Sequence, residues 1–270
     1  MTALTALEAL LLGENTVSKL LFVGCLALCL TGTSAAQAQS APATDWSGFY
    51  VGADLGAGWA SLDAFTTVDN AGTYFIGDDN ALLTDASSGD LSQLRPVGGA
   101  HAGYLHQLGR AVLGLEVSAG TLFFDKSRSA RWEYNTVPGV FGNIEQSVEA
   151  DWLATLQARA GWGEDRWLVY VTGGLAVTRL EMDYSYSDDS ASSGRSRSSE
   201  QEVRFGWTLG LGGEYALDEN WSIRGQYLYA NFGSLKTYSP LENSGSFYDD
   251  LAHKASLETH TALIGLSYRF

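Results

Sequence analysis

The residues with the most scope for chemistry in this chain of 270 residues are four histidines and the acids near them. His253 follows the pair Asp249-Asp250, and two acids beside a histidine could activate a water molecule for hydrolysis. A solvated histidine in an acidic loop gives the same pattern, and no second acid pair stands at a recognisable spacing. We therefore predict no catalytic residues and no enzyme activity.

Cofactor and metal chemistry has equally little support in the sequence. His253 or Tyr248 could act as an axial ligand of a haem iron, but one histidine and one tyrosine in a loop do not define a haem site. No spacing of histidine, cysteine and acidic residues typical of a metal site is present. Neither a metal nor a cofactor is predicted.

The first long polar segment of the chain is strongly acidic. It contains six aspartates against one basic residue, Arg95. Crowded carboxylates repel one another and attract hard cations, so weak association of calcium or magnesium is one interpretation. A solvated acidic loop is the other, and we favour it. The aspartates are Asp63, Asp69, Asp78, Asp79, Asp85 and Asp90.

The elements that would have to position such residues are strands. Residues 205–232 form two arms around a short polar turn, and the first arm alternates apolar residues with glycine, threonine and Glu214. The second arm, from Trp221 to Tyr229, places Arg224 on the face opposite its aromatic residues. Aromatic residues at both ends of an apolar face, with aliphatic residues between them, are typical of a strand that faces lipid.

The same period-2 alternation recurs along the chain and gives eight strands. Three short turns alternate strictly with four long polar segments, at about residues 61–96, 123–150, 179–202 and 232–256. All the long segments then lie at one end of the sheet. Because lipid tolerates no open sheet edge, the first and last strands are expected to pair. The predicted fold is all-β: an eight-stranded antiparallel up-and-down transmembrane β-barrel.

Composition agrees with this fold and excludes one class of partner. The chain has 31 glycines, 4 prolines and 12% aromatic residues. Its formal net charge is −15, so it lacks the basic face that a phosphate backbone requires. No nucleic acid is expected as a partner.

Residues 1–38 are predicted to be a signal peptide. Lys19 precedes the apolar run 20–30, and an Ala-Gln-Ala sequence ends at residue 38, where a signal peptidase would cleave. A run of about 11 residues is too short for a transmembrane helix, which needs about 20. Both cysteines lie within this run, so no disulfide is expected in the barrel domain, residues 39–270. Lipidation of Cys25 is disfavoured, because it would leave most of the run after the cleavage point.

Several short motifs resemble those of one protein family. They are Gly206-Trp207-Thr208, Gly212-Gly213-Glu214-Tyr215, Asn220-Trp221 and the opening Trp46-Ser47-Gly48-Phe49-Tyr50-Val51-Gly52. In these motifs the chain resembles the small outer-membrane β-barrel proteins of Gram-negative bacteria. These are opacity-type, outer-membrane-protein-A-like barrels, common in alphaproteobacteria and often described only as porin family.

The resemblance implies a location in the cell outer membrane, with short periplasmic turns and four long external loops. It also implies partners: outer-membrane lipid and lipopolysaccharide, the barrel-assembly machinery, and possible host or surface ligands. Cations held by the acidic first loop would help the surface pack against lipopolysaccharide.

The face opposite the aromatic residues combines glycine with charged residues, which suits a narrow lumen better than the apolar interior of a soluble lipocalin-type barrel. We expect side chains to fill this lumen. Because unpaired buried charges are costly, Glu214 is expected to pair with Arg224, and Glu116 with Arg159 or Arg269. The predicted lumen charge network is Asp54, His101, Glu116, Arg159, Glu214, Arg224 and Arg269.

Aromatic residues are expected at both membrane interfaces. Tyr268 and Phe270 lie at the end of the last predicted strand, and they resemble the carboxy-terminal signal that the barrel-assembly machinery recognises. The predicted interface set is Tyr268, Phe270, Trp46, Trp59, Trp162, Trp167, Trp207 and Trp221.

The predicted function is that of a non-enzymatic outer-membrane surface protein, which contributes to envelope structure and to surface interactions through its acidic external loops. A small diffusion pore and a surface receptor for a haem-type ligand are the alternatives. An outer-membrane hydrolase is disfavoured, because His260-Thr261 lacks the His-x-Ser pattern of barrel deacylases.

Overall fold

The computed structural model describes residues 44–69, 74–75, 77–243, 245 and 249–270. The predicted signal peptide, residues 1–38, and Tyr248 lie outside the described residues. The description below therefore concerns the predicted barrel domain.

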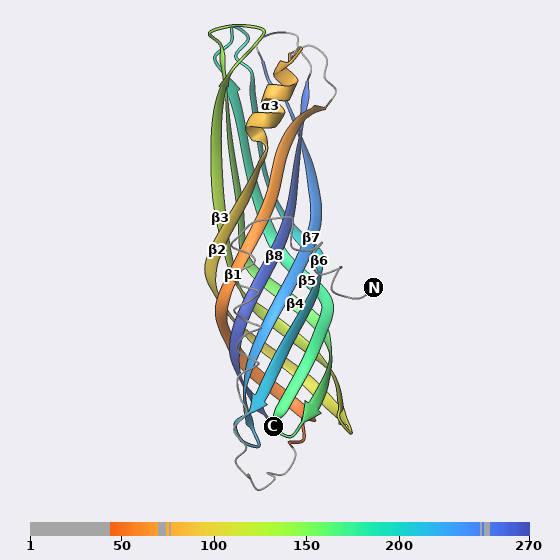
Figure 1. Cartoon of the computed structure of the whole chain (residues 1–270). Coiled ribbons are helices and arrows are strands. Elements are labelled where there is room, and N and C mark those ends of the chain that lie inside the picture. The colour runs from red at the N-terminus through yellow and green to blue at the C-terminus, as the bar shows by residue number, and fades with distance from the viewer. Residues whose placement is uncertain (1–43, 70–73, 76, 244, 246–248) are drawn as a thin grey trace, which may run out of the picture. The chain divides into compact units, whose positions relative to one another are not determined.

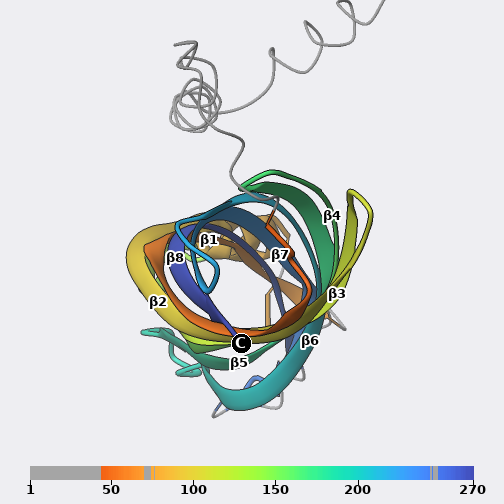
Figure 2. The ribbon, with the colours of Figure 1, turned by 90° about the horizontal axis from the view of Figure 1, so that it is seen from below.

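Eight antiparallel strands form a closed barrel in which each strand pairs with its neighbours in the chain and β1 pairs with β8. The ring is seen end-on in Figure 2. The strands are β1 Gly48–Asp69, β2 Gly89–Leu108, β3 Ala111–Glu133, β4 Phe141–Glu164, β5 Trp167–Asp188, β6 Arg195–Ala216, β7 Trp221–Pro240 and β8 Asp250–Arg269. The predicted fold class is confirmed.

Among the described residues one helix is present, α3 Asp79–Ser87, near the end of the barrel opposite the short turns (Figure 1). We call this end the distal end, and the other the turn end. No helix in the described part of the chain has the length and apolar character needed to cross a bilayer.

One row of paired, outward-facing residues shows how strongly the strands tilt. The row leaves β1 at Phe49 and, after one circuit of the barrel, returns to β1 at Trp59, ten residues farther along (49 to 59). At about 3.3 Å per residue and a tilt of about 45°, ten residues climb roughly 23 Å, close to the apolar band of about 25 Å that transmembrane barrels present to lipid. The row is Phe49, Tyr104, Leu115, Ala158, Gly173, Leu209, Tyr229, His260 and Trp59.

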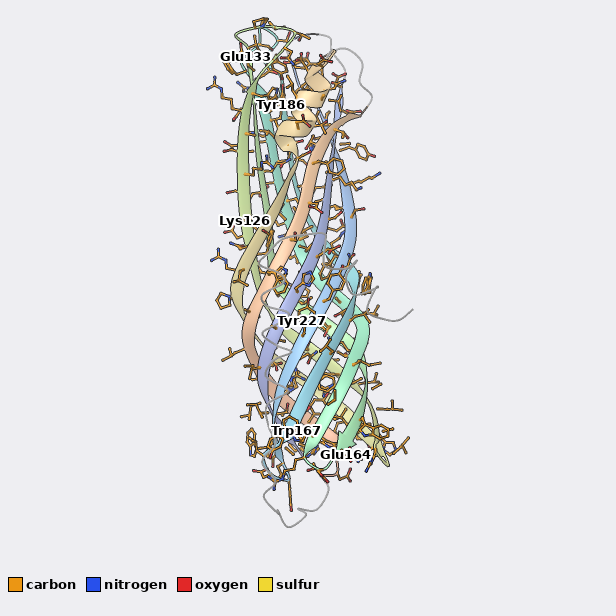
Figure 3. All side chains as sticks on the ribbon, in the orientation of Figure 1. Lys126, Glu133, Glu164, Trp167, Tyr186 and Tyr227 are labelled. Carbon is orange, nitrogen blue, oxygen red and sulfur yellow. The ribbon has the colours of Figure 1, made fainter. Side chains whose placement is uncertain are left out.

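Aromatic belts mark both ends of this row. At the turn end, ring contacts join Phe49 to Tyr104, Trp167 to Tyr215 and Trp221 to Tyr268, with centroids 4.8, 4.7 and 5.0 Å apart. At the other end Trp59 stacks on His260 at 4.7 Å, and Trp207 meets Tyr229 at 5.2 Å. We call the part of the barrel between these belts the membrane band. Figure 3 shows Trp167 near the turn end and Tyr227 higher up the wall, beside the second belt.

All eight strands continue past the second belt, and we call this continuation, together with α3, the distal body. Three of the four polar segments that the sequence indicated as long loops are therefore strand for most of their length, and a connection such as residues 189–194 is short. The first segment, residues 61–96, has strand at both ends and α3 between them. Serine and aspartate have low strand propensity, which hides the alternation of buried Tyr184 and Tyr186 with more exposed Asp183 and Ser185.

The distal body consists of two four-stranded sheets rather than one closed ring. Among the described residues, β2 pairs with β3 only over Gly99–Leu108, and β6 pairs with β7 only over Trp207–Ala216. Beyond those points β3–β6 form one sheet, and β7, β8, β1 and β2 form the other. Two seams without strand pairing separate the sheets, and a backbone bridge between Arg195 and Glu242 spans the β6–β7 seam at its far end.

β-bulges lie at the level where the barrel divides. The register shifts between Thr121 and Phe124 on β3 and between Asn231 and Ser234 on β7. Bulges are common at barrel rims, because an extra residue re-aims the strand. On β7 the extra residue, Gly233, moves the buried positions from even to odd numbers, so that Leu235 points inward.

Candidate functional site in the barrel lumen

The centre of the lumen is a buried charge network organised by Arg224. This guanidinium donates from Nε to Asp54 Oδ1 at 2.9 Å and from Nη2 to Asp54 Oδ2 at 2.8 Å. Its Nη1 donates to Glu116 Oε2 at 2.7 Å. One side chain of β7 thereby ties together β1 and β3 across the barrel.

Arg159 holds the second half of the network. Its Nη2 lies 3.2 Å from Glu116 Oε2, and its Nη1 lies 3.3 Å from Glu214 Oε2. Its guanidinium also covers the Tyr170 ring at 3.8 Å. Three carboxylates thus face two guanidinium groups, and buried charges of both signs are paired, as the low dielectric of the interior requires.

The expected pairing of Glu214 with Arg224 is wrong. The two residues are direct cross-strand neighbours, but Arg224 reaches across the lumen, while Glu214 accepts from Arg159 and from the Ser222 hydroxyl at 2.5 Å. The planar fork of arginine fits a carboxylate that faces it end-on, which Asp54 does. The expected contact of Glu116 with Arg159 is present.

Arg269 does not join the network. Its guanidinium lies 4.9 Å from the Trp46 ring centre, and its Nη2 donates to the Glu219 carbonyl at 3.4 Å. Arg269 is the last residue of β8, at the turn end, where it lies beside Trp46 and the β6–β7 turn. Of the two partners expected for Glu116, Arg159 is the one that contacts it, and the predicted place of Arg269 in the lumen charge network is wrong.

His101 completes an arrangement that the sequence did not reveal. Its Nδ1 lies 2.8 Å from Asp54 Oδ2, and its Nε2 lies 2.9 Å from the hydroxyl of Ser267. Serine, histidine and aspartate in this order have the hydrogen-bond geometry of a hydrolase triad. The available signal was weak: Ser267 simply has the inward parity of β8, between lipid-facing Leu266 and Tyr268.

The surroundings of this triad give no room for a substrate. Ser267 is 1% exposed, and Asp54 already accepts hydrogen bonds from Nε and Nη2 of Arg224. The cavity beside Asp54, Glu116 and Arg224 has a volume of about 50 Å³. This space suits a few water molecules and not an acyl chain or a peptide.

An apolar cluster closes the lumen toward the turn end. We call it the turn-end plug; its members are Trp46, Tyr50, Leu105, Val112, Leu168, Tyr170 and Ala216. Tyr50 joins it to the charge network, since its hydroxyl donates to Glu116 Oε2 at 2.6 Å. The prediction that Trp46 is an interface residue is wrong: its side chain is 0% exposed. Trp46 precedes β1, so strand parity does not apply, and its backbone N–H donates to Gln107 Oε1 at 2.8 Å.

A second apolar cluster closes the lumen where the distal body begins. We call it the distal plug; it includes fully buried Leu62 and Phe124 together with small residues such as Ala176 and Ala230. Here the wall has ordinary polarity, with apolar residues inside and polar residues outside, the reverse of the membrane band. The lumen network therefore lies between two apolar layers.

The other predicted interface residues lie at the belts. Trp162, Trp167, Trp207, Trp221 and Phe270 are exposed on the outer wall. Trp59 and Tyr268 are half-buried by their ring partners, and Tyr268 also meets Phe270 at 5.2 Å.

His253 lies in the distal body, outside the membrane band, and is buried. Its Nδ1 pairs with the Thr66 hydroxyl at 3.0 Å and its Nε2 with the Ser239 hydroxyl at 2.7 Å, while the Tyr184 ring lies 3.7 Å from its own. Burial lowers the pKa of His253 to about 4. Both ring nitrogens are occupied, so neither is free to bind a haem iron.

The acids near His253 do not form a water-activating pair. Asp249 Oδ2 accepts from the backbone N–H groups of Tyr74 and Phe75, each at 2.9 Å. In the first connection, Asp79 is buried and accepts from the backbone of Asn135 at 2.9 Å and from the Thr136 hydroxyl, which fixes α3 against the β3–β4 connection. Within the described ranges, no group of three histidine, cysteine or acidic residues is placed to hold a metal ion.

Comparison with known proteins agrees with this architecture. Residues 25–270 match the family model described as outer membrane protein beta-barrel domain. The chain is 31% identical over 240 residues to a 31 kDa outer-membrane immunogenic protein of Brucella melitensis, covering 88% of this chain and 89% of that protein. It is 28% identical over 226 residues to a 22 kDa outer membrane protein of Rhizobium leguminosarum, covering 83% and 82%.

Solved structures that match this chain include Neisserial surface protein A, with a TM-score of 0.36 and 14% identity over 83% of this chain and 98% of that one. OprG from Pseudomonas aeruginosa has a TM-score of 0.40 and 14% identity over 84% and 98%.

A tilted eight-stranded barrel with an apolar outer band between aromatic belts is a transmembrane β-barrel of the bacterial outer membrane. This chain belongs to the outer membrane β-barrel domain family, and its location is the outer membrane. In such barrels short turns face the periplasm, so the distal body is external.

Proposed function

We propose that this protein is a non-conducting, non-enzymatic surface protein of the outer membrane. In this role the membrane band anchors the distal body, which stabilises the envelope through contacts with lipopolysaccharide and presents a rigid surface to external ligands. The barrel-assembly machinery inserts it.

The observation that carries the proposal is the layered closure of the lumen. A solute moving along the axis would meet the turn-end plug, then the charge network, then the distal plug. Eight strands leave an interior that side chains fill, whereas classical porins with an aqueous channel have about 16 to 18 strands. The residual cavity of about 50 Å³ agrees with this view.

A planar-bilayer recording tests the proposal against the alternative of a small diffusion pore. Purified, heat-modifiable barrel should give no steady conductance, while a porin reconstituted in the same bilayer gives stable channels. A liposome-swelling assay with small sugars provides an independent readout. Stable single channels, or swelling at the rate of the porin control, would overturn the non-conducting role.

Within the part of the chain that the structure describes, no residue supports the haem-receptor alternative. His253 was its main candidate, and both of its ring nitrogens are bound within the distal body. When haem is titrated into the purified protein, the Soret band should show no saturable shift.

A further inference from the structure

The outer wall of the distal body carries a pair of lysines placed directly opposite each other. Lys236 of β7 and Lys254 of β8 are register partners, and both project outward, since their neighbours Leu235 and Ala255 are buried. Like charges opposite one another on adjacent strands are destabilising, because the side chains leave the sheet about 5 Å apart. A chain with a net charge of −15 has many acids that could relieve this repulsion.

No acid of the described chain does so. Neither ammonium group forms an ion pair with any carboxylate in the described ranges. The only marked contact of Lys254 in this part of the chain is with an aromatic ring, that of Phe65, whose centre lies 5.3 Å from Nζ. An anion from outside the chain could therefore bind between the two lysines and relieve their repulsion.

The position of the pair indicates which anion is available. Lys254 lies six residues from His260 of the second belt (254 to 260), toward the distal end. At about 3.3 Å per residue and 45° tilt this places it about 14 Å beyond that belt. At that height the wall of an outer-membrane barrel is surrounded by the phosphorylated sugars of lipopolysaccharide. Lysine binds phosphate as a compact point charge.

Two aromatic residues flank the lysines and fit a sugar ring. Phe65 is the register partner of Lys254 on β1, and Tyr238 stands two residues beyond Lys236 on the same face of β7, 56% exposed. Aromatic faces pack against the apolar faces of sugar rings, while the Tyr238 hydroxyl can donate to a sugar oxygen.

We propose that Lys236 and Lys254, with Phe65 and Tyr238 beside them, form a binding site for a phosphorylated sugar of the lipopolysaccharide core. The site deepens the proposed envelope role and rests on it. Its failure is distinguishable from failure of that role, because the conductance measurement does not depend on these lysines.

The experiment measures binding of fluorescently labelled lipopolysaccharide to the full barrel in detergent. Wild type should bind with an affinity that falls as salt rises. The double variant Lys236→Gln/Lys254→Gln should bind at least about tenfold more weakly, because each lysine near an anionic lipid surface strengthens binding several-fold. Lys236→Arg/Lys254→Arg keeps both charges and should bind like wild type.

Arg131→Gln is the matched control. Arg131 also lies over an aromatic ring, that of Phe141 at 4.3 Å, but it belongs to the far end of the distal body. Its loss should leave affinity unchanged. All variants are first checked for heat-modifiable gel mobility, and the two lysine-site variants change only side chains on the outer wall.

Two further probes identify the source of the anion. Dephosphorylated lipopolysaccharide should bind wild type as weakly as phosphorylated lipopolysaccharide binds the glutamine variant. Inorganic phosphate alone should not compete at millimolar concentration. The proposal is overturned if the glutamine variant binds like wild type, if Arg131→Gln loses as much affinity, or if inorganic phosphate displaces the lipid fully.

Discussion

Arg224 is the residue on which the lumen depends most directly, because it neutralises two carboxylates at once. Arg224→Met would leave His101 as the side-chain partner of Asp54 and would remove one of the two guanidinium groups that contact Glu116. Removing one partner from a buried ion pair typically costs about 3–5 kcal/mol of unfolding free energy. Urea unfolding in lipid vesicles should show a loss of this size.

The control for Arg224 is an exposed ion pair of the same chemistry. Arg110 Nη2 lies 3.0 Å from Glu164 Oε1 at the turn end, where both side chains are more than half exposed. Arg110→Met should cost less than about 1 kcal/mol, because solvent screens such pairs. Equal losses for the two variants would contradict the view that the network is stabilised by its burial.

Glu149 gives the distal body a predictable pH response. It lies outside the membrane band on the outer wall of β4, between Asp125 of β3 and Glu181 of β5 as register partners. Repulsion from Asp125, and then desolvation and Glu181, raises the pKa of Glu149. A carboxyl whose pKa is raised by folding binds its proton more readily in the folded state, so stability should rise as pH falls through that pKa.

The variant Glu149→Gln separates this effect from other acids. At neutral pH it should be slightly more stable than wild type, and the difference should vanish at the acid end of the titration and in high salt. The urea midpoint of the distal body, measured at several pH values, reports it. A variant less stable than wild type at neutral pH would show that Glu149 makes a favourable contact instead.

At this scale the sequence predicted which residues point inward but not what they touch. Alternation alone placed Asp54, Glu116, Glu214 and Arg224 on one face, because parity is a local property of a strand. The partners of Arg224 depend on the shear of the closed ring, which brings β7 opposite β1 and β3. Parity also failed for Trp46, which precedes the first strand.

At the scale of the element, the bulge on β7 allows one strand to belong to both the membrane band and the distal body. Below it the outward residues face lipid, and above it they face water, with the inward set displaced by one residue. Gly233 adopts φ +67°, a conformation that costs a residue with a Cβ roughly 1–2 kcal/mol. No atom within 4 Å would obstruct an added Cβ, so the cost would be purely conformational.

Gly233→Ala should therefore lower the unfolding free energy by roughly 1 kcal/mol. Gly225 of the same strand is the matched control, because an added Cβ there also meets nothing within 4 Å and its φ is ordinary. Gly225→Ala should be neutral or slightly stabilising. Thermal unfolding of the two variants in one detergent decides the matter; a neutral Gly233→Ala would mean that the bulge relaxes.

The polar segments show why element lengths were harder to predict than element number. The strands of the membrane band have aromatic ends and aliphatic centres, which is a strong pattern. Their continuations consist largely of serine and acidic residues outside, with an alternating inner face of tyrosine, alanine and leucine. Their low strand propensity made these continuations hard to predict from the sequence, and hydrogen bonds to the neighbouring strands stabilise them in the fold.

At the scale of the whole molecule, two folding environments share one set of strands. The membrane band is apolar outside and polar inside, and the distal body has the reverse arrangement, with an apolar core between two sheets. The sequence predicted the first arrangement and the closure of the ring. It could not predict the second, because the division of the barrel depends on where β2–β3 and β6–β7 pairing ends.

This division predicts that the distal body opens independently of the membrane band. Phe124 is 1% exposed in the distal plug, and Phe124→Ala would remove its packing and leave a cavity, at a typical cost of about 3–5 kcal/mol. If the distal body is a separate cooperative unit, amide hydrogen exchange beyond the bulges should quicken on the order of 100-fold or more, and exchange within the membrane band should stay slow. Phe205→Ala is the control: Phe205 is 75% exposed on the outer wall of β6 and packs in neither the turn-end plug nor the distal plug, so amide exchange in the distal body should not change. Equal acceleration of exchange in both regions of Phe124→Ala would show instead that the membrane band and the distal body unfold as one unit.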